Sequence, residues 1–346
     1  MKRSLFITGM LASCAYVLLA VSLAMGQTPL TRDAIETATP GQTLPAKQEE
    51  GSAPNSNAAH EGPSALVARV QIALDRAGFS VGVIDGYAGE NYSGALAAFQ
   101  TVNNLEVTGT VTPPTWELLS AAFGDDVMQT YSITSEDLAA DYIAEVPSDY
   151  GEKAKLEALS FTSPAEMLAE RFHMDEDFLR SLNPSADFAT VGEVIPVANP
   201  MRPIREASVR HIVVDGHNGR VQAFDGEGLL VADYPATVGS TSTPSPSGTH
   251  EVVAVVENPN YTYNPNINFT QGDNTEVLTI APGPNGPVGS IWIDLSKPTY
   301  GIHGTPDPSK IAKSQSNGCV RLTNWDAEEL SKLVSKGTIV EFLEGS

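Results

Sequence analysis

The chain has 346 residues, with 42 acidic and 20 basic side chains and a formal net charge of -22. Its length allows two or three domains. The acidic balance argues against nucleic acid and anionic lipid as partners, because both carry negative charge themselves. With only two cysteines, the chain also falls outside the disulfide-rich secreted class, so its domains need ordinary hydrophobic cores.

Residues 1–26 have the layout of a secretory signal peptide. Lys2 and Arg3 give a positive start, an apolar run follows from Ala15 to Ala24, and Gly26 ends a set of small residues suited to cleavage. Lipoprotein-type cleavage before Cys14 is disfavoured, because the apolar run would then remain behind the lipidated cysteine. Retention of the segment as an uncleaved anchor is the alternative. We expect an exported protein, periplasmic or associated with the cell wall, with no later segment apolar enough to span a bilayer.

Residues 27–62 are rich in Pro, Ala, Thr, Gln and Ser and poor in large apolar side chains. This composition is typical of disordered chain. It predicts a flexible linker that lets the following domains reach away from the membrane or the wall.

Residues 63–122 change to a helical pattern. In the first helix, Leu66, Val70 and Leu74 repeat at helical spacing and should face inward, whereas Gln71 and Asp75 should fall on other faces. A glycine-punctuated loop follows this helix. The pattern predicts an amphipathic helix at the start of a small domain.

Two further helices complete this unit, one from about Ser93 to Val102 and one opened by Thr112–Pro114. Proline is tolerated there because the first helical turn has no partner for its N–H. The three-helix unit resembles the peptidoglycan-binding domain 1 family, which implies wall binding. The resemblance is carried by Gln71, Leu74, Gly78, Gly82, Asp85-Gly86, Gly89, Ala95, Phe99-Gln100, Leu105, Gly109 and Thr115-Trp116. The sequence Asn91–Gly94 departs from the family, which usually has a threonine before its second helix.

Residues 131–200 combine short helices with a closing strand. Helical faces are expected at Ala165–Phe172 and Phe178–Leu182, and Gly192–Val197 has the pattern of a strand. This order resembles a LysM module, which binds wall glycan. A long insertion separates the opening strand, at Thr130–Ile133, from the helices. A structural adaptor leading to the next domain is the alternative.

From about residue 209 the pattern changes to strands. Runs rich in β-branched residues alternate with glycine turns from His211 to Val256, and further strands are expected at Gly289–Leu295 and Thr338–Phe342. One helix is expected from about Trp325 to Val334. The chain is therefore expected to be multidomain α+β, ending in a mostly-β domain at residues 209–343.

Cys319 is the one cysteine that remains once the signal segment is removed. A lone thiol is either an inert core residue or a nucleophile. His303 can supply the base that a cysteine nucleophile needs, because the thiolate is the attacking form. Gly318 allows close approach of a substrate, and the N–H groups of Gly318 and Cys319 are candidates for stabilising an oxyanion. Arg321 can hold the loop or bind a substrate carboxylate.

Residues 209–343 resemble the catalytic domain of the YkuD-like L,D-transpeptidases. The segments that carry the resemblance are Ser247–Thr249, Ala281–Asn285, Pro287–Gly289, Gly301–Thr305 and, above all, Ser316–Leu322. The resemblance implies that Cys319 is the nucleophile, His303 its general base, and the backbone carbonyl of Gly304 the third, orienting member. It also implies that Ser316 and Gly318 shape the loop and that Arg321 is the family arginine.

The sequence departs from the family at Asn317, where histidine is usual. That histidine is not the base, so the mechanism is retained, and any role of the second imidazole beside the oxyanion passes to an amide or is lost. Tyr300 and Trp292 lie near the site in the sequence. Tyr300 is expected to contact substrate in the donor cleft, and Trp292 is favoured as a core residue.

The resemblance implies an exported enzyme of cell wall biogenesis. It would form a thioester between Cys319 and a peptidoglycan stem tetrapeptide, release D-alanine and transfer the acyl group to an amine, giving a 3→3 cross-link. With water as acceptor it would be an L,D-carboxypeptidase or hydrolase, and with a lipoprotein lysine a protein-to-wall ligase. A non-catalytic wall-binding scaffold is the alternative from another class. The expected partners are peptidoglycan stem peptides and glycan, and carbapenem-type inhibitors by family resemblance, with no cofactor and no metal.

Overall fold

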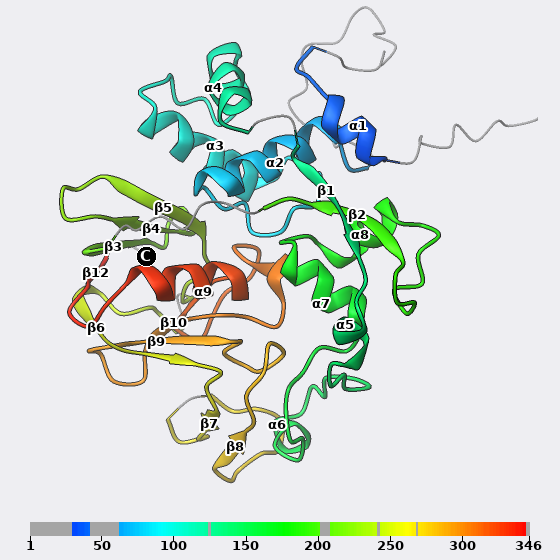
Figure 1. Cartoon of the computed structure of the whole chain (residues 1–346). Coiled ribbons are helices and arrows are strands. Elements are labelled where there is room, and N and C mark those ends of the chain that lie inside the picture. Colours follow the sequence, from blue (N-terminus) through cyan, green and yellow to red (C-terminus); the bar gives the residue numbers. More distant parts are fainter. Residues whose placement is uncertain are drawn as a thin grey trace, which may run out of the picture.

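The computed structural model of this chain describes residues 30–41, 62–123, 126–200, 208–240, 243–267 and 269–343. The predicted signal segment, residues 1–26, lies outside these ranges, as does most of the predicted linker. Within the described part, no helix is both long and apolar enough to cross a membrane. Figure 1 shows a largely helical N-terminal part packed against a mostly-β C-terminal part.

The expectation of a disordered linker over residues 27–62 is wrong for one short piece. Helix α1 spans Arg32–Thr37. Its Ile35 is fully buried in the N-terminal core, and the carboxylate of Glu36 accepts a hydrogen bond of 2.7 Å from the N–H of Met128. The average composition of the segment hides this helix, because a single apolar side chain with a docking partner is enough to order it.

The predicted three-helix unit is confirmed. It consists of α2 (Ala65–Ala77), α3 (Glu90–Val102) and α4 (Pro113–Phe123). Helix α3 begins at Glu90 rather than at the predicted Ser93, because Tyr92 already turns into the core.

Helix α2 is buried on more faces than an amphipathic pattern predicts. Gln71 and Asp75, expected on other faces, are 2% and 0% exposed. The Gln71 side chain donates to Asp85 and accepts from the N–H of Gly86, both at 2.7 Å, so it holds the glycine-rich loop. Asp75 lies 3.0 Å from the Nδ1 atom of His173. The helix is central in the molecule because later parts of the chain pack on its polar faces.

The segment that follows forms a strand–helix–helix–strand module. β1 (Met128–Ser132) pairs antiparallel with β2 (Val194–Ala198), and between them lie α5 (Ser135–Ala139), α6 (Tyr150–Lys153), α7 (Pro164–Arg171) and α8 (Glu176–Leu182). The order β1, α7, α8, β2 is the one expected of a LysM-like module, and α5 and α6 occupy the insertion. Its apolar side chains share one hydrophobic core with the three-helix unit. These two modules therefore pack against each other as one body rather than as separate domains joined by a linker.

The C-terminal domain is built on an eight-stranded sheet of the described residues, in the order β11-β10-β9-β6-β12-β3-β4-β5. Its strands are β3 (His211–Asp215), β4 (Arg220–Phe224), β5 (Leu230–Pro235), β6 (Gly248–Glu257), β9 (Ile291–Leu295), β10 (Gly301–His303), β11 (Val320–Arg321) and β12 (Ile339–Phe342). β7 (Tyr261–Tyr263) and β8 (Leu278–Ile280) form a separate pair. Helix α9 (Asn324–Leu333) contributes Ala327, Leu330 and Leu333 to the same core as the sheet. The expected mostly-β domain with one late helix is confirmed.

The N-terminal modules dock on the outer strand β5 and on α9. The N–H of Ser80 donates to the carbonyl of Asp233 at 2.8 Å, and the N–H of Asp233 donates to the carbonyl of Gly78 at 3.0 Å. The Asp233 carboxylate also forms a buried ion pair with Arg220. The hydroxyl of Ser80 donates to Asp326 of α9 at 2.9 Å. This contact covers the exposed edge of the sheet, which would otherwise offer unpaired backbone groups.

Candidate active site

A cavity of about 520 Å³ opens on the C-terminal domain and contains most of the predicted site residues. The predicted residues that line it are His303, Asn317, Cys319, Arg321 and Tyr300. Its wall also includes aromatic and apolar side chains that the sequence did not assign to a site, among them Tyr150, Tyr261, Phe269 and Trp292. One cleft therefore brings together a thiol, an imidazole and a guanidinium.

The strand register explains why these groups meet. β10 and β11 run parallel, with Ile302 opposite Val320 and His303 opposite Arg321. Ile302 and Val320 are fully buried in the core. Because side chains alternate along a strand, His303 and Arg321 point to the opposite face, and Cys319, two residues before Arg321, joins them. The pattern of two short strands thus places the thiol and the imidazole in one cleft.

His303 is held as a neutral base. Its Nδ1 atom lies 2.7 Å from the carbonyl oxygen of Gly304, so Nδ1 carries the proton and donates it, and Nε2 keeps a lone pair. The ring of Trp292 stacks on the imidazole at 5.5 Å between centroids. Burial lowers the pKa of His303 to about 4, an effect that the Gly304 hydrogen bond opposes and the charge of Arg321 reinforces. At neutral pH the imidazole is therefore ready to accept a proton.

Cys319 is a half-buried free thiol. Its sulfur lies 3.7 Å from the carbonyl oxygen of Thr299, to which it donates. Burial raises the pKa of the thiol, and a backbone hydrogen bond with Gly301 and the charge of Arg321 act in the opposite direction. With His303 neutral in the same cleft, the resting state of the two groups is thiol and imidazole rather than thiolate and imidazolium. Such a pair suits proton transfer to the base during attack.

Ser316 and Gly318 make close contacts within the loop before Cys319. The hydroxyl of Ser316 donates to the carbonyl of Cys319 and accepts from the N–H of Gly318 at 3.0 Å. Gly318 has a φ of +111°, and a Cβ atom there would lie 2.8 Å from the ring of Tyr300, so only glycine fits. The N–H of Gly318 is thus engaged inside the loop, which leaves the N–H of Cys319 as the candidate oxyanion donor of this pair. Asn317 is exposed and lines the cleft.

Trp292 lies in the cleft and not in the core, so its expected core role is wrong. Ile291, Ile293 and Leu295 of β9 are buried, whereas Trp292 stacks on His303 from the other face of the strand. Gly301 makes this possible, because a Cβ atom there would lie 2.6 Å from the indole ring. The alternation along β9 was the signal that could have placed the indole, since its apolar neighbours occupy every second position.

Helix α7 of the preceding module supports the site from behind. Both carboxylate oxygens of Glu170 accept from the Asn324 side-chain amide, at 3.0 and 3.2 Å. The Asn324 oxygen accepts from the N–H of Ser290 and lies so close to Gly304 that a Cβ atom there would be 2.2 Å away. Glu170 therefore holds the asparagine that packs against the carbonyl partner of His303.

Glu170 makes stability depend on pH. Burial raises its pKa from 4.5 to about 8, with repulsion by Glu166 and Glu328 adding to the shift and the Asn324 hydrogen bond opposing it. Between pH 4.5 and about pH 8, the folded state therefore binds a proton at Glu170 that the unfolded state lacks. Protonation of Glu170 thus stabilises the folded state, and this stabilisation is lost as pH rises through about 8. Glu170→Gln should change the melting temperature more favourably at pH 8.5 than at pH 5.5. We expect the mutant-minus-wild-type difference in melting temperature to be about 2 °C or more higher at pH 8.5. Calorimetry at both pH values measures this difference.

The exposed Glu136→Gln on α5 serves as the control for that comparison and is expected to shift the melting temperature equally at both pH values. An equal shift for Glu170→Gln as well would show that the buried carboxyl does not take up a proton on folding.

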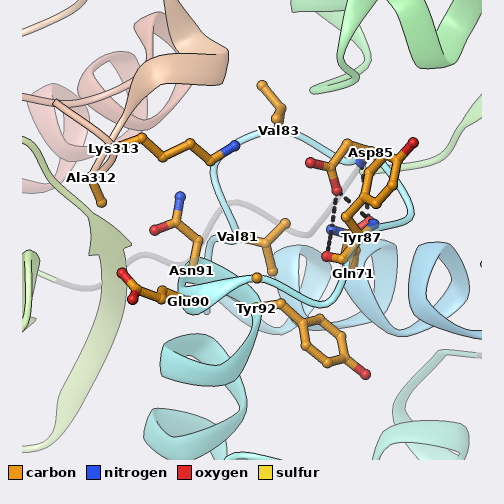
Figure 2. Close-up of a pocket in the computed structure, with 11 residues that line it drawn as sticks. Gln71, Val81, Val83, Asp85, Tyr87, Glu90, Asn91, Tyr92, Ala312 and Lys313 are labelled. Carbon is orange, nitrogen blue, oxygen red and sulfur yellow. Dashed lines mark hydrogen bonds between the residues drawn. The ribbon is translucent and has the colours of Figure 1, made fainter. Parts of the chain in front are cut away.

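A second cavity, of about 220 Å³, lies between the three-helix unit and the C-terminal domain. Figure 2 shows Lys313 extending toward the glycine-rich loop near Val83, with Asp85 and Tyr87 at the other end. The side-chain amide of Gln71 donates hydrogen bonds to the Asp85 carboxylate and to the backbone carbonyl of Tyr87. This cavity has no thiol or imidazole in its lining, so the chemistry belongs to the larger cleft. In the described part of the chain no group of three His, Cys, Asp or Glu side chains could hold a metal ion.

Family models match both ends of the described chain. The model for the "L,D-transpeptidase catalytic domain" matches residues 209–342, and the "Putative peptidoglycan binding domain" matches residues 63–119. The resemblances to the peptidoglycan-binding domain 1 family and to the L,D-transpeptidase catalytic domain are thereby confirmed.

The chain is similar to several curated proteins and to solved structures of L,D-transpeptidases. The "Putative L,D-transpeptidase YkuD" of Bacillus licheniformis is 33% identical over 171 residues, which cover 45% of this chain and 88% of that protein. A "Putative L,D-transpeptidase in ATP synthase subunits region" of Fuscovulum blasticum is 32% identical, over 38% of this chain and 68% of that protein. L,D-transpeptidase 3 of Mycobacterium tuberculosis, solved with a faropenem-derived adduct, matches with a TM-score of 0.33 and 15% identity, over 44% of this chain and 75% of that one. On the two family models and the curated relatives, the chain belongs to the L,D-transpeptidase family of peptidoglycan cross-linking acyltransferases.

Proposed function

We propose that this protein is exported and catalyses peptidoglycan cross-linking through an acyl-enzyme on Cys319. The observation that carries the proposal is the shared cleft of Cys319, His303 and Arg321, with His303 neutral and oriented by Gly304. The family membership supplies the substrate class. The predicted signal segment at residues 1–26 supports export, and the peptidoglycan-binding domain supports action at the wall.

The first half-reaction forms the thioester. The sulfur of Cys319 attacks the carbonyl carbon of the amide between the third stem residue and the terminal D-alanine, and the thiol proton moves to Nε2 of His303. The N–H of Cys319 faces the developing oxyanion in this proposal. When the tetrahedral intermediate collapses, the C–N bond breaks, and the leaving amine of D-alanine takes the proton from His303. The guanidinium of Arg321 meets a carboxylate of the stem.

The second half-reaction transfers the acyl group. An amine of another stem attacks the thioester carbonyl and gives a proton to His303, the C–S bond breaks, and the thiolate of Cys319 recovers that proton. The product is a 3→3 cross-link. Acylation of Cys319 by carbapenem-type inhibitors follows from the same nucleophile and is part of this proposal.

Incubation of the purified protein with tetrapeptide muropeptides tests the proposal. Mass spectrometry is expected to show loss of D-alanine and a dimer joined between third residues. Tripeptide without dimer would instead indicate water as the acceptor and an L,D-carboxypeptidase. Linkage to an added peptide that bears a C-terminal lysine would indicate a protein-to-wall ligase. Unchanged tetrapeptide would overturn the catalytic proposal and favour a wall-binding scaffold.

A further inference from the structure

The insertion between β1 and α7 has no role in a LysM-like module, yet it reaches the active-site cleft. It contains α5 and the short helix α6, and its part between α5 and α7 is the part that reaches the cleft. Figure 1 shows α6 beside β8 at the end of the molecule that lies away from the three-helix unit. The insertion thus connects the N-terminal modules with the part of the C-terminal domain that borders the catalytic cavity.

One end of the insertion is fastened to the segment between β7 and β8. The side-chain amide of Gln271 donates to the carbonyl of Ser148 at 3.1 Å, and its oxygen accepts from the N–H of Tyr150 at 2.9 Å. The side chain of Asn274 donates to Asp149 at 2.8 Å. These contacts join backbone groups and partly buried side chains of both segments, and together they fix where α6 lies against the cleft.

The other end is fastened to the segment between β8 and β9. The N–H of Leu159 donates to the carbonyl of Pro282 at 2.8 Å, and the N–H of Asn285 donates to the carbonyl of Leu159 at 2.9 Å. The side chain of Asn285 also donates to the carbonyl of Ser160. At Gly283 a Cβ atom would lie 2.2 Å from the Leu159 carbonyl oxygen, so the two segments can approach this closely only because residue 283 is glycine. Both ends are therefore held by specific contacts with the C-terminal domain.

At the end fastened to the β7–β8 segment, the ring of Tyr150 is held in a fixed orientation. It packs edge to face against Tyr263 at 5.3 Å, Phe269 at 5.8 Å and Tyr261 at 6.0 Å between centroids. The ammonium group of Lys153 lies 5.6 Å from the ring centroid. Tyr263 is fully buried, whereas Tyr150 is only partly buried and lines the same 520 Å³ cavity as Cys319. The part of Tyr150 that lines the cavity adds aromatic surface to the catalytic cleft, and its neighbours hold that surface in place.

We propose that Tyr150 is a substrate-contacting residue of the catalytic cleft, supplied by the insertion of the preceding module. The inference deepens the proposed function and rests on it. The substrate it fits is a peptide with both an alkyl side chain and a carboxylate. The alkyl side chain packs against the aromatic wall of Tyr150 and Tyr261, and the carboxylate pairs with Arg321 on the same cleft. The C-terminal domain alone would keep Tyr261 but lack the Tyr150 part of this wall.

Steady-state kinetics of Tyr150→Ala and Tyr150→Leu with a tetrapeptide muropeptide test the proposal. We expect KM to rise about tenfold in both variants, which corresponds to about 1.4 kcal/mol of lost binding, and kcat to stay within about threefold of the wild type. Leucine at position 150 still packs an apolar side chain against Tyr263 and Phe269. The leucine variant can therefore be measured even if the alanine variant does not fold. Lys155→Ala is the matched control, because Lys155 is in the same insertion, its side chain is 68% exposed, and its salt bridge is with the exposed Glu152.

The rate of Cys319 alkylation by iodoacetamide separates binding from structural damage. It should be unchanged in both Tyr150 variants, because the thiol and His303 keep their surroundings. A KM within about twofold of the wild type in a folded variant overturns the inference. If alkylation is also slower in such a variant, Tyr150 only supports the fold around the thiol. If the wild-type protein itself leaves the muropeptide unchanged, the proposed function fails and the inference falls with it.

Discussion

Replacing Cys319 by alanine is expected to abolish cross-linking and the release of D-alanine, a loss of at least about 10⁴-fold in kcat, because no other group in the cleft can form the acyl-enzyme. The cleft offers a base, a guanidinium and aromatic rings, but within the described residues Cys319 is the one free thiol. The same change should remove covalent labelling by a carbapenem. Muropeptide analysis and intact-protein mass spectrometry measure the two effects.

Ser314→Ala is the control for this loss. Ser314 lies on the same loop, is exposed, and donates only to the carbonyl of Lys310 at 3.2 Å. This variant should retain wild-type turnover and labelling. Residual cross-linking or labelling in a folded Cys319→Ala protein would remove Cys319 from the role of nucleophile.

Replacing His303 by glutamine is expected to lower kcat/KM for D-alanine release by about 10²- to 10⁴-fold, the range typical of a lost general base. Glutamine keeps a polar side chain near the carbonyl of Gly304 but cannot take the thiol proton. In the variant, the rate should increase about tenfold per pH unit across the neutral range, because attack then depends on the small thiolate fraction of a thiol whose pKa is raised by burial.

The wild-type enzyme should show a different pH profile. Burial lowers the pKa of His303 from its ordinary value of 6.5 to about 4. The imidazole therefore stays unprotonated, and able to accept a proton, at pH values well below 6.5. The acidic limb of kcat/KM, which reports the free enzyme, is therefore expected near pH 4, with little change between pH 5 and pH 7. His217→Gln, in an exposed turn, should leave the profile unchanged. An acidic limb near pH 6.5, or a His303→Gln profile parallel to that of the wild type, would show that His303 is not the base.

One cleft of the structure holds Cys319, His303 and Arg321, which the sequence singled out, whereas the surroundings of that cleft were not predicted. Cys319 and His303 stand in local motifs, and Gly318 and Ser316 act through contacts only a few residues away in the chain. Local patterns of this kind are visible without any fold. The hydrogen bond from His303 to the carbonyl of Gly304 could be expected from family resemblance because it too joins adjacent residues.

The surroundings of the site depend on contacts between distant parts of the chain. Tyr150 lies more than a hundred residues before Cys319, and nothing in its local sequence indicates a cleft. Trp292 was assigned to the core because a large apolar residue is usually buried, but β9 turns it toward His303. Glu170 has the sequence context of an ordinary polar position on α7 and becomes buried only where α9 covers it.

The sequence by itself therefore determined the fold class, the three-helix unit and the mostly-β C-terminal domain, and it singled out Cys319 and His303 as the proposed nucleophile and base. These follow from hydrophobic periodicity and short motifs, which act over a few residues. Only the tertiary structure decided that α1 is ordered, that Gln71 and Asp75 are buried, and that an insertion adds Tyr150 to the aromatic wall of the cleft. The physical reason is that burial is a property of packed surfaces: which face of a helix or strand loses water depends on what another segment places against it.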